Sequence, residues 1–201
     1  HDAEGPLVPE VSLYFQNRLF RANRTVKQSA EEFAAFRSYN YPALAEVGVN
    51  ITFHRDYIHR PAHADAELRV AAALDDRVLV IRLFPGLREQ VLRAMLSIEG
   101  LRAVVLETYG AGNAPTAPEF IRAVREAVMN VTQCSGGRVA MELYETGRQL
   151  QEAGVICGHD ITTEAAVAKL MYVLGQNLPA ERTQRLLRHA LRGEFTDAGI
   201  A

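Results

Sequence analysis

A short loop that follows an apolar run holds the residues best suited to chemistry in this sequence. Residues 103–106 read Ala-Val-Val-Leu, and Gly110, Gly112 and Asn113 come shortly after them. The apolar run predicts a buried parallel strand, and open α/β sheets bind ligands at the carboxyl ends of such strands. The glycines allow the backbone to approach a ligand closely, and Asn113 offers both a donor and an acceptor. A plain strand-to-helix turn uses the same residue types, so spacing alone leaves both interpretations open.

Lys27 and Cys134 are the other side chains that could take part in nucleophilic catalysis. A lysine beside a nucleophile helps to deprotonate it when burial lowers the lysine pKa, although most lysines are simply solvated. Cys134 ends an apolar segment, and no histidine lies near it in the sequence. No local pattern therefore marks Cys134 as a nucleophile.

Two further groups of polar residues are interpreted as solvated surface. The first is a set of three histidines around a predicted strand: His54, His59 and His63. Residues an odd number apart on a strand point to opposite faces, so these side chains are not expected to converge on a metal. The second is a basic face of a predicted helix: Arg182, Arg185, Arg188 and Arg192. It lacks an aromatic platform for bases, which favours a solvated face or a subunit contact over a nucleic-acid site.

Composition narrows the class of protein. The 201 residues are 48% hydrophobic and 23% charged, with a net charge of -2, which is ordinary for a globular domain and gives no sign of a nucleic-acid partner. No run of roughly 18 apolar residues occurs, so no membrane span is expected. The two cysteines, Cys134 and Cys157, suit free thiols in a reducing compartment better than a disulfide framework.

The elements that must position these residues follow from hydrophobic periodicity and turn signals. Strands are expected over residues 10–15, 18–21, 78–83, 103–106, 128–133 and 155–156, with strand or hairpin in 50–59. Helices are expected over residues 30–36, 87–97, 119–127, 144–153, 162–174 and 179–191, with a helix-like segment at 43–46. Strands that alternate with helices after residue 77 predict a parallel α/β layer fold.

One junction in this pattern is unusual. The predicted helix ends at Ala127, and the strand pattern starts at Val128 without a turn residue between them. A helix that feeds a parallel strand normally needs a short polar loop. Either the protein has a deletion there or residues are missing from the sequence, and we favour the second explanation.

Several blocks of this sequence together resemble one family, the cytoplasmic (type I) L-asparaginases. The most specific is Tyr-Gly-x-Gly-Asn-x-Pro over residues 109–115, and the others are residues 9–15, 21–27, 33–42, 130–137, 153–156, 160–166, 169–170 and 191–194. They follow the order of the family and cover nearly the whole chain. The resemblance implies a Rossmann-like, parallel-sheet C-terminal α/β domain at residues 77–201. Before it would come a linker at 61–76 and, at 1–60, the C-terminal end of a larger α/β N-terminal domain.

The resemblance also implies an activity. Enzymes of this family hydrolyse L-asparagine to L-aspartate and ammonia with a threonine nucleophile and without a cofactor or metal, in the cytoplasm. Their Thr-Gly-Gly-Thr and His-Gly-Thr-Asp motifs do not occur here, and the single Thr-Gly pair, at Thr146, lacks the rest of the motif. By resemblance Lys27 is the catalytic lysine that joins a Thr-Asp pair. Asn113, lent by a neighbouring subunit of a dimer or dimer of dimers, would help to hold the substrate's amino group, and Tyr144 and Glu142 would approach the same site.

An effector site is the second implication. In type I asparaginases the cysteine matching Cys134 lies near an effector site for asparagine, and allosteric members carry Arg where Glu107 stands and Thr where Val26 stands. A carboxylate at position 107 would repel the effector's own carboxylate. We therefore expect weak or absent allostery by asparagine.

Two alternatives to an asparaginase stay open. One is a non-catalytic ligand-binding or oligomerisation module derived from this fold. The other is the asparaginase-like subunit of a tRNA-dependent amidotransferase, which the Leu-Arg-Gly-Glu ending at residues 191–194 and the near-neutral charge disfavour.

Overall fold

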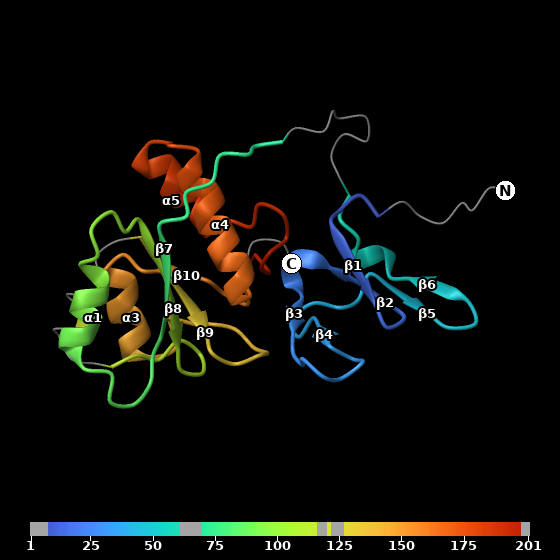
Figure 1. The fold of residues 1–201 in the computed structure, drawn as a ribbon, viewed down its shortest axis with the longest axis horizontal. Helices are drawn as coiled ribbons and strands as arrows, with labels where there is room; N and C mark the ends of the chain where they lie inside the picture. The colour runs from blue at the N-terminus through green and yellow to red at the C-terminus, as the bar shows by residue number, and fades with distance from the viewer. Residues whose placement is uncertain (1–7, 61–69, 116–119, 122–126, 198–201) are drawn as a thin grey trace. The chain divides into compact units, whose positions relative to one another are not determined.

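The computed structural model describes residues 8–60, 70–115, 120–121 and 127–197. The chain divides into two compact units, His1–Ala71 and Ala72–Ala201 (Figure 1). Residues 61–69, most of the linker expected at 61–76, lie outside the described part. In the described part of the chain, no helix combines the length and apolar character needed to cross a bilayer.

The first unit is built on a four-stranded antiparallel sheet. Its strands are ordered β1 (Ser12–Phe15), β2 (Arg18–Arg21), β5 (Ala45–Val47) and β6 (Ile51–Phe53). Gln16 and Asn17 join β1 to β2 with φ of 43° and 63°, the backbone of a two-residue turn that matches the twist of paired strands. A separate antiparallel pair joins β3 (Val26–Lys27) to β4 (Phe36–Arg37), and short 3-10 turns cover Ala22–Arg24 and Arg55–Tyr57.

Two predicted helices in this unit are wrong. Residues 30–36 form a bent loop that closes the β3–β4 pair, in which Gln28 N–H donates to the Ala35 carbonyl at 2.8 Å. A helix there could make only one or two turns, which is too short to be stable without packing. Residues 45 and 46 of the helix-like segment belong to β5, because they pair with β2, and next to them Leu44 N–H donates to the Leu19 carbonyl at 2.7 Å.

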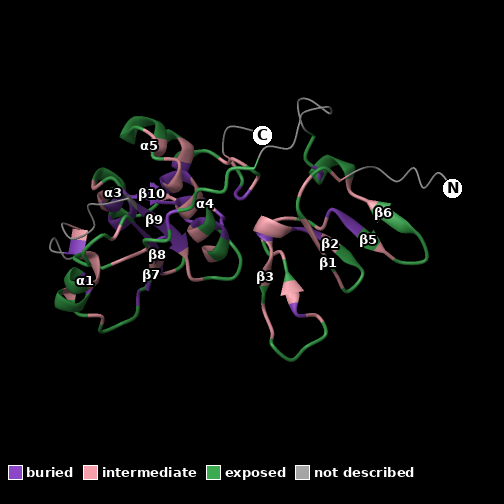
Figure 2. Cartoon of the chain, turned by 45° about the horizontal axis from the view of Figure 1, so that its top comes forward, coloured by how far each residue is buried: buried purple, intermediate pink, exposed green. Residues whose placement is uncertain are grey.

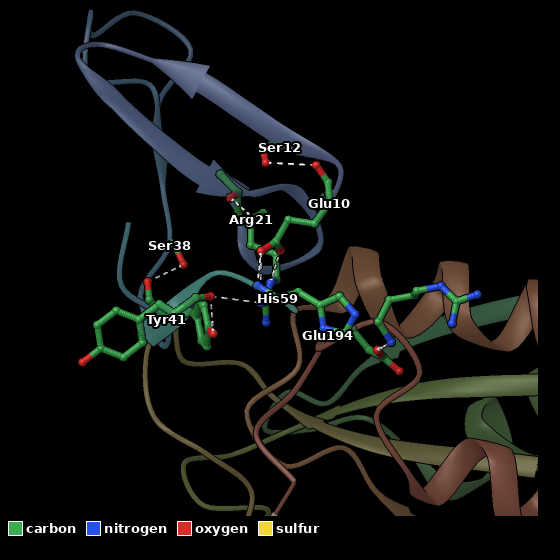
Figure 3. A network of polar contacts seen from close by, with 10 residues as sticks. Glu10, Ser12, Arg21, Ser38, Tyr41, His59 and Glu194 are labelled. Atoms are coloured by element: carbon green, nitrogen blue, oxygen red, sulfur yellow. Dashed lines mark hydrogen bonds and ion pairs between the residues drawn. The ribbon is translucent and has the colours of Figure 1, made fainter. Parts of the chain in front are cut away.

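Glu10 and Arg21 tie the ends of the first unit together (Figure 3). Their side chains form a buried ion pair, and Glu10 also accepts a hydrogen bond from the N–H of His59 at 2.9 Å. The Arg21 guanidinium donates to the Tyr57 carbonyl at 3.2 Å and lies over the Tyr41 ring, 4.3 Å from its centroid. A buried charge needs such partners, since an unpaired one is costly. The segment after β6 is thus fixed beside the start of β1.

The second unit confirms the predicted parallel α/β fold. Its sheet runs in the order β10 (Ile156–Cys157), β9 (Ala127–Thr132), β8 (Ala103–Thr108), β7 (Val78–Arg82), with every neighbouring pair parallel. The helices are α1 (Glu89–Leu96), α3 (Glu145–Glu152), α4 (Thr163–Gly175) and α5 (Ala180–Arg188). The helix expected over 119–127 falls almost wholly outside the described residues, so the unusual junction stays a prediction.

Helices cover both faces of this sheet, whose strands contain many buried residues (Figure 2). Alternate strand residues supply two apolar cores. Val105 and Met129 face the α4 and α5 side, where they pack with Leu170. Val104 faces the α1 and α3 side and packs with Leu92. Successive side chains of a strand point to opposite faces of the sheet. Because helices cover both faces, both sets of side chains are apolar, and the strand sequence is a continuous apolar run. The carboxyl ends of the strands form the edge where the loops of open α/β sheets commonly carry function.

Residues after α5 return to α4 through a buried ion pair. The Lys169 ammonium contacts the Glu194 carboxylate and the His189 carbonyl oxygen. Glu194 also accepts from the backbone N–H groups of Leu191 at 3.0 Å and Arg192 at 2.7 Å. Burial alone would raise the pKa of Glu194, but the hydrogen bond and charge of Lys169 and these N–H groups outweigh it, so its pKa lies below its ordinary value.

A second contact holds the same tail to the loop before α4. The Asp160 carboxylate accepts from the N–H and the hydroxyl of Thr196, both at 2.7 Å. Thr162 caps α4, since its hydroxyl accepts from Ala165 N–H at 3.1 Å. The loop that leads into α4 is therefore anchored from both sides.

We predict that Glu194→Gln lowers the free energy of unfolding by about 3–5 kcal/mol at neutral pH, because it leaves Lys169 buried without its counter-charge. Because the folded-state pKa of Glu194 is depressed, its contribution is complete above the ordinary glutamate value of 4.5 and is lost as the pH falls through the lower folded-state value. The gap between wild type and variant should close in acid. Denaturant unfolding between pH 7 and 3 measures this.

The matched control is Glu99→Gln, which removes an exposed carboxylate and should change stability by less than about 0.5 kcal/mol. A gap between wild type and Glu194→Gln that is equally large at both ends of the pH range would contradict the assignment.

Candidate functional site

A loop at residues 109–113 follows the carboxyl end of β8. Every backbone carbonyl group of this loop accepts a hydrogen bond. Six donors reach them: the Gly112 and Asn113 N–H groups on the Tyr109 oxygen, the Thr132 hydroxyl on the Gly110 oxygen, the Ala140 N–H on the Ala111 oxygen, the Asn130 amide on the Gly112 oxygen, and the Tyr109 N–H on the Asn113 oxygen. Their lengths run from 2.6 to 3.4 Å. Surface loops commonly leave such groups to water. This loop is instead fixed by its neighbours.

Two buried polar side chains in the carboxyl-terminal halves of β8 and β9 support this loop. Thr108 of β8 and Asn130 of β9 are both fully buried. The Thr108 hydroxyl donates to the Asn130 side-chain oxygen at 2.6 Å, and the Asn130 amide donates to the Gly112 carbonyl at 3.4 Å. Buried polar groups are costly unless they are satisfied, and here each partner satisfies the next. The pair thus joins the sheet to the loop.

Glycine is required at two positions around this edge. Gly112 has φ of 109°, and a Cβ there would lie 2.8 Å from the Val139 side chain. Gly147 in α3 packs directly on backbone, since its Cβ would lie 2.3 Å from the Met141 carbonyl oxygen. Residues 139–141 therefore pack against Gly112 of the loop on one side and against Gly147 of α3 on the other.

Asn113 and the start of α3 are brought together by this packing. The Thr146 hydroxyl donates to the Asn113 side-chain oxygen at 3.3 Å, and Thr146 is buried. Tyr144 precedes α3 at its N-cap position and exposes about half of its side chain, 49%. Glu142 is exposed close by in the sequence. Asn113 therefore lies beside the start of α3. Contact of Tyr144 or Asn113 with a substrate stays a prediction.

Glu107 and Cys134, the predicted effector-site residues, lie at the same edge of the sheet. Glu107 pairs in register with Arg82, and their side chains meet at 3.4 Å. Its other carboxylate oxygen accepts from the Thr163 hydroxyl at 2.7 Å. Gln133, next to Cys134, donates to the Glu107 carbonyl at 2.9 Å. Cys134 itself is exposed, so a ligand at this edge would meet a thiol and an already paired carboxylate.

Lys27 belongs to the first unit, where it lies on β3 opposite Phe36 of β4. Its side chain is exposed, and the ammonium lies 6.0 Å from the centroid of the Phe36 ring. The second cysteine, Cys157, donates weakly to the Val139 carbonyl at 3.6 Å, and burial raises the pKa of its thiol. Cys157 is accordingly a packing residue, since the reactive form of cysteine is the thiolate.

Sequence reasoning missed the supporting residues Thr108, Asn130, Thr146 and Thr163. A signal existed for two of them, because Thr108 and Asn130 are polar residues within otherwise apolar strand patterns. The sequence shows Thr146 only as part of a Thr-Gly pair that lacks the rest of the nucleophile motif. Among the described residues, no group of three or more His, Cys, Asp and Glu is arranged to hold a metal ion. The edge offers an amide, hydroxyls and backbone groups, which is chemistry for binding a small polar ligand.

Comparisons with known proteins give the same family for both parts of the chain. The glutaminase/asparaginase C-terminal domain matches residues 77–187, and the N-terminal asparaginase domain matches residues 3–59. The 60 kDa lysophospholipase of Mus musculus is 42% identical over 94% of this chain and 34% of its own length. L-asparaginase 1 of Escherichia coli K12 is 41% identical over 94% of this chain and 57% of its own length.

A solved structure agrees with this. L-asparaginase I of Vibrio cholerae superposes with a TM-score of 0.86 at 40% identity, covering 94% of this chain and 58% of that chain. The present chain therefore spans 57% of the length of the Escherichia coli L-asparaginase 1, 58% of the Vibrio cholerae enzyme and 34% of the mouse lysophospholipase. On both of its matched domains, the chain belongs to the glutaminase/asparaginase family.

Proposed function

We propose that the protein is an L-asparaginase that hydrolyses L-asparagine to L-aspartate and ammonia with a threonine nucleophile outside these 201 residues. The observation that supports this most is the match of both family domains in order along one chain, with a hydrogen-bonded loop that presents Asn113. The proposal includes a cytoplasmic location and self-association as a dimer or dimer of dimers.

In the proposed mechanism this chain supplies a proton-accepting lysine and a substrate contact. Lys27 lies beside the nucleophile in the assembled site, where its neutral amine helps to deprotonate the threonine hydroxyl. Asn113 is lent across the subunit interface and accepts a hydrogen bond from the substrate's amino group. Since a site shared between subunits needs both of them, activity depends on assembly.

The first test measures ammonia release from L-asparagine by the purified protein together with its intact mass. Activity with a mass well above the 22.2 kDa of this chain supports the proposal. A mass of 22.2 kDa without ammonia release supports the alternative of a ligand-binding or oligomerisation module. Lysophospholipid hydrolysis is measured in parallel, because a relative named for that activity is 42% identical.

We predict that Lys27→Ala lowers kcat/KM for asparagine by at least about 100-fold, the usual contribution of a proton-transferring side chain. Lys27→Arg should be nearly as inactive, because a guanidinium keeps the charge but does not give up its proton. Arg37→Ala, which removes an exposed cation from the neighbouring strand, is the matched control and should stay within about twofold of wild type. Full activity of Lys27→Ala would remove Lys27 from the mechanism.

A second prediction concerns the effector edge. Initial rates over a wide range of asparagine concentrations should fit a hyperbola with a Hill coefficient of about 1, because the Glu107 carboxylate repels the carboxylate of an effector. Glu107→Gln keeps the size of the side chain and removes the charge, so it isolates the repulsion. A sigmoidal response of the wild-type protein would show that the effector binds despite Glu107.

A further inference from the structure

Thr146 stands at the start of α3 in a position where a hydroxyl is not needed for the helix. Its side chain is buried, with 7% of its surface exposed. Threonine hydroxyls inside helices often bond to a carbonyl four residues back. Here the hydroxyl donates instead to the side-chain oxygen of Asn113, 33 residues earlier in the chain, at 3.3 Å.

The backbone around this contact is fixed independently of the hydroxyl. Gly147 packs against the Met141 backbone so closely that a Cβ would lie 2.3 Å from the Met141 carbonyl oxygen. Ala140 N–H donates to the Ala111 carbonyl at 2.9 Å, which joins the same segment to the loop of Asn113. Both ends of the Thr146–Asn113 contact are therefore held in place before any ligand arrives.

We propose that Thr146 is a positioning residue that orients the side-chain amide of Asn113 toward the substrate's amino group. This inference rests on the function proposed above. A free asparagine amide can turn over and exchange its oxygen for its NH2 group. The oxygen attracts a substrate ammonium and the NH2 group repels it, so the orientation decides whether Asn113 binds.

Thr146 biases this choice because its hydroxyl donates to the oxygen and leaves that atom a second acceptor position. An amide oriented in advance costs less to order when the substrate binds. Loss of the hydroxyl should therefore weaken substrate binding and leave the chemical step intact. The effect must act through Asn113, which separates positioning from general structural support.

The experiment compares kcat and KM for asparagine in Thr146→Val, Thr146→Ser, Asn113→Ala and the double variant Asn113→Ala/Thr146→Val. Thr146→Val keeps the shape and should raise KM by about three- to tenfold, the effect of one hydrogen bond, with kcat within about twofold. Thr146→Ser keeps the hydroxyl and should restore the wild-type KM. Thr183→Val makes the same change in α5, where the hydroxyl donates to the Leu178 carbonyl, and should leave KM unchanged.

The double variant decides the mechanism. Thr146→Val should add nothing to KM once Asn113 is alanine, since non-additivity is expected only for residues that act together. An equal rise of KM in both Asn113 backgrounds, or a wild-type KM in Thr146→Val, overturns the inference while the proposed function stands. An unchanged KM in Asn113→Ala overturns the substrate contact of Asn113 and the inference with it.

A measurement without turnover covers a protein that releases no ammonia. Asparagine side chains are labelled with ¹⁵N, and the amide signals of Asn113 are assigned by their absence in Asn113→Ala. The inference requires that Thr146→Val moves the chemical shifts of the Asn113 amide group to those of solvent-exposed asparagine side chains. Thr146→Ser should leave these chemical shifts unchanged. Unchanged signals in Thr146→Val would show that the hydroxyl does not orient the amide, whatever the protein's activity.

Discussion

The second unit depends on how the loop after β8 satisfies its backbone hydrogen bonds. Each carbonyl of residues 109–113 has a donor, and the donors come from β9, from the segment before α3 and from the loop itself. A loop held in this way keeps one conformation, because moving it would break several bonds at once. Asn113 inherits that rigidity from its backbone, and Thr146 extends it to the side-chain amide. Order in the loop is thus built before a ligand is present, which lowers the cost of binding one.

This order explains two polar residues in an otherwise apolar sheet. Thr108 and Asn130 would be replaced by apolar residues if packing alone decided, because burying them requires complete hydrogen bonding. Thr108 ends β8 and Asn130 lies two residues before the end of β9, from where its amide reaches the Gly112 carbonyl. At that place an apolar residue would leave a loop carbonyl without its donor. The polar pair therefore serves the loop rather than the sheet.

The sequence predicted the second unit better than the first for a physical reason. Runs such as residues 103–106 are buried on both faces, so their pattern reports the strand directly. In the first unit, Ala45 and its neighbours have helix-forming character, but pairing with β2 and β6 decides their structure. Asn113 was recognisable because glycines surround it, whereas Thr146 was not, since its partner lies 33 residues away. Contacts across such distances leave no periodic trace in a sequence.

Glu107 shows how strongly one residue of this edge is tied to its neighbours. It pairs in register with Arg82 and accepts a hydrogen bond from Thr163. The resemblance to allosteric type I asparaginases implies Arg at this position. Glu107→Arg without a second change would place two guanidinium groups side by side on neighbouring strands, where like charges repel. It would also remove the acceptor of the Thr163 hydroxyl. Replacement of Glu107 by a cationic residue therefore requires compensation at Arg82 as well, so the two positions should be varied together.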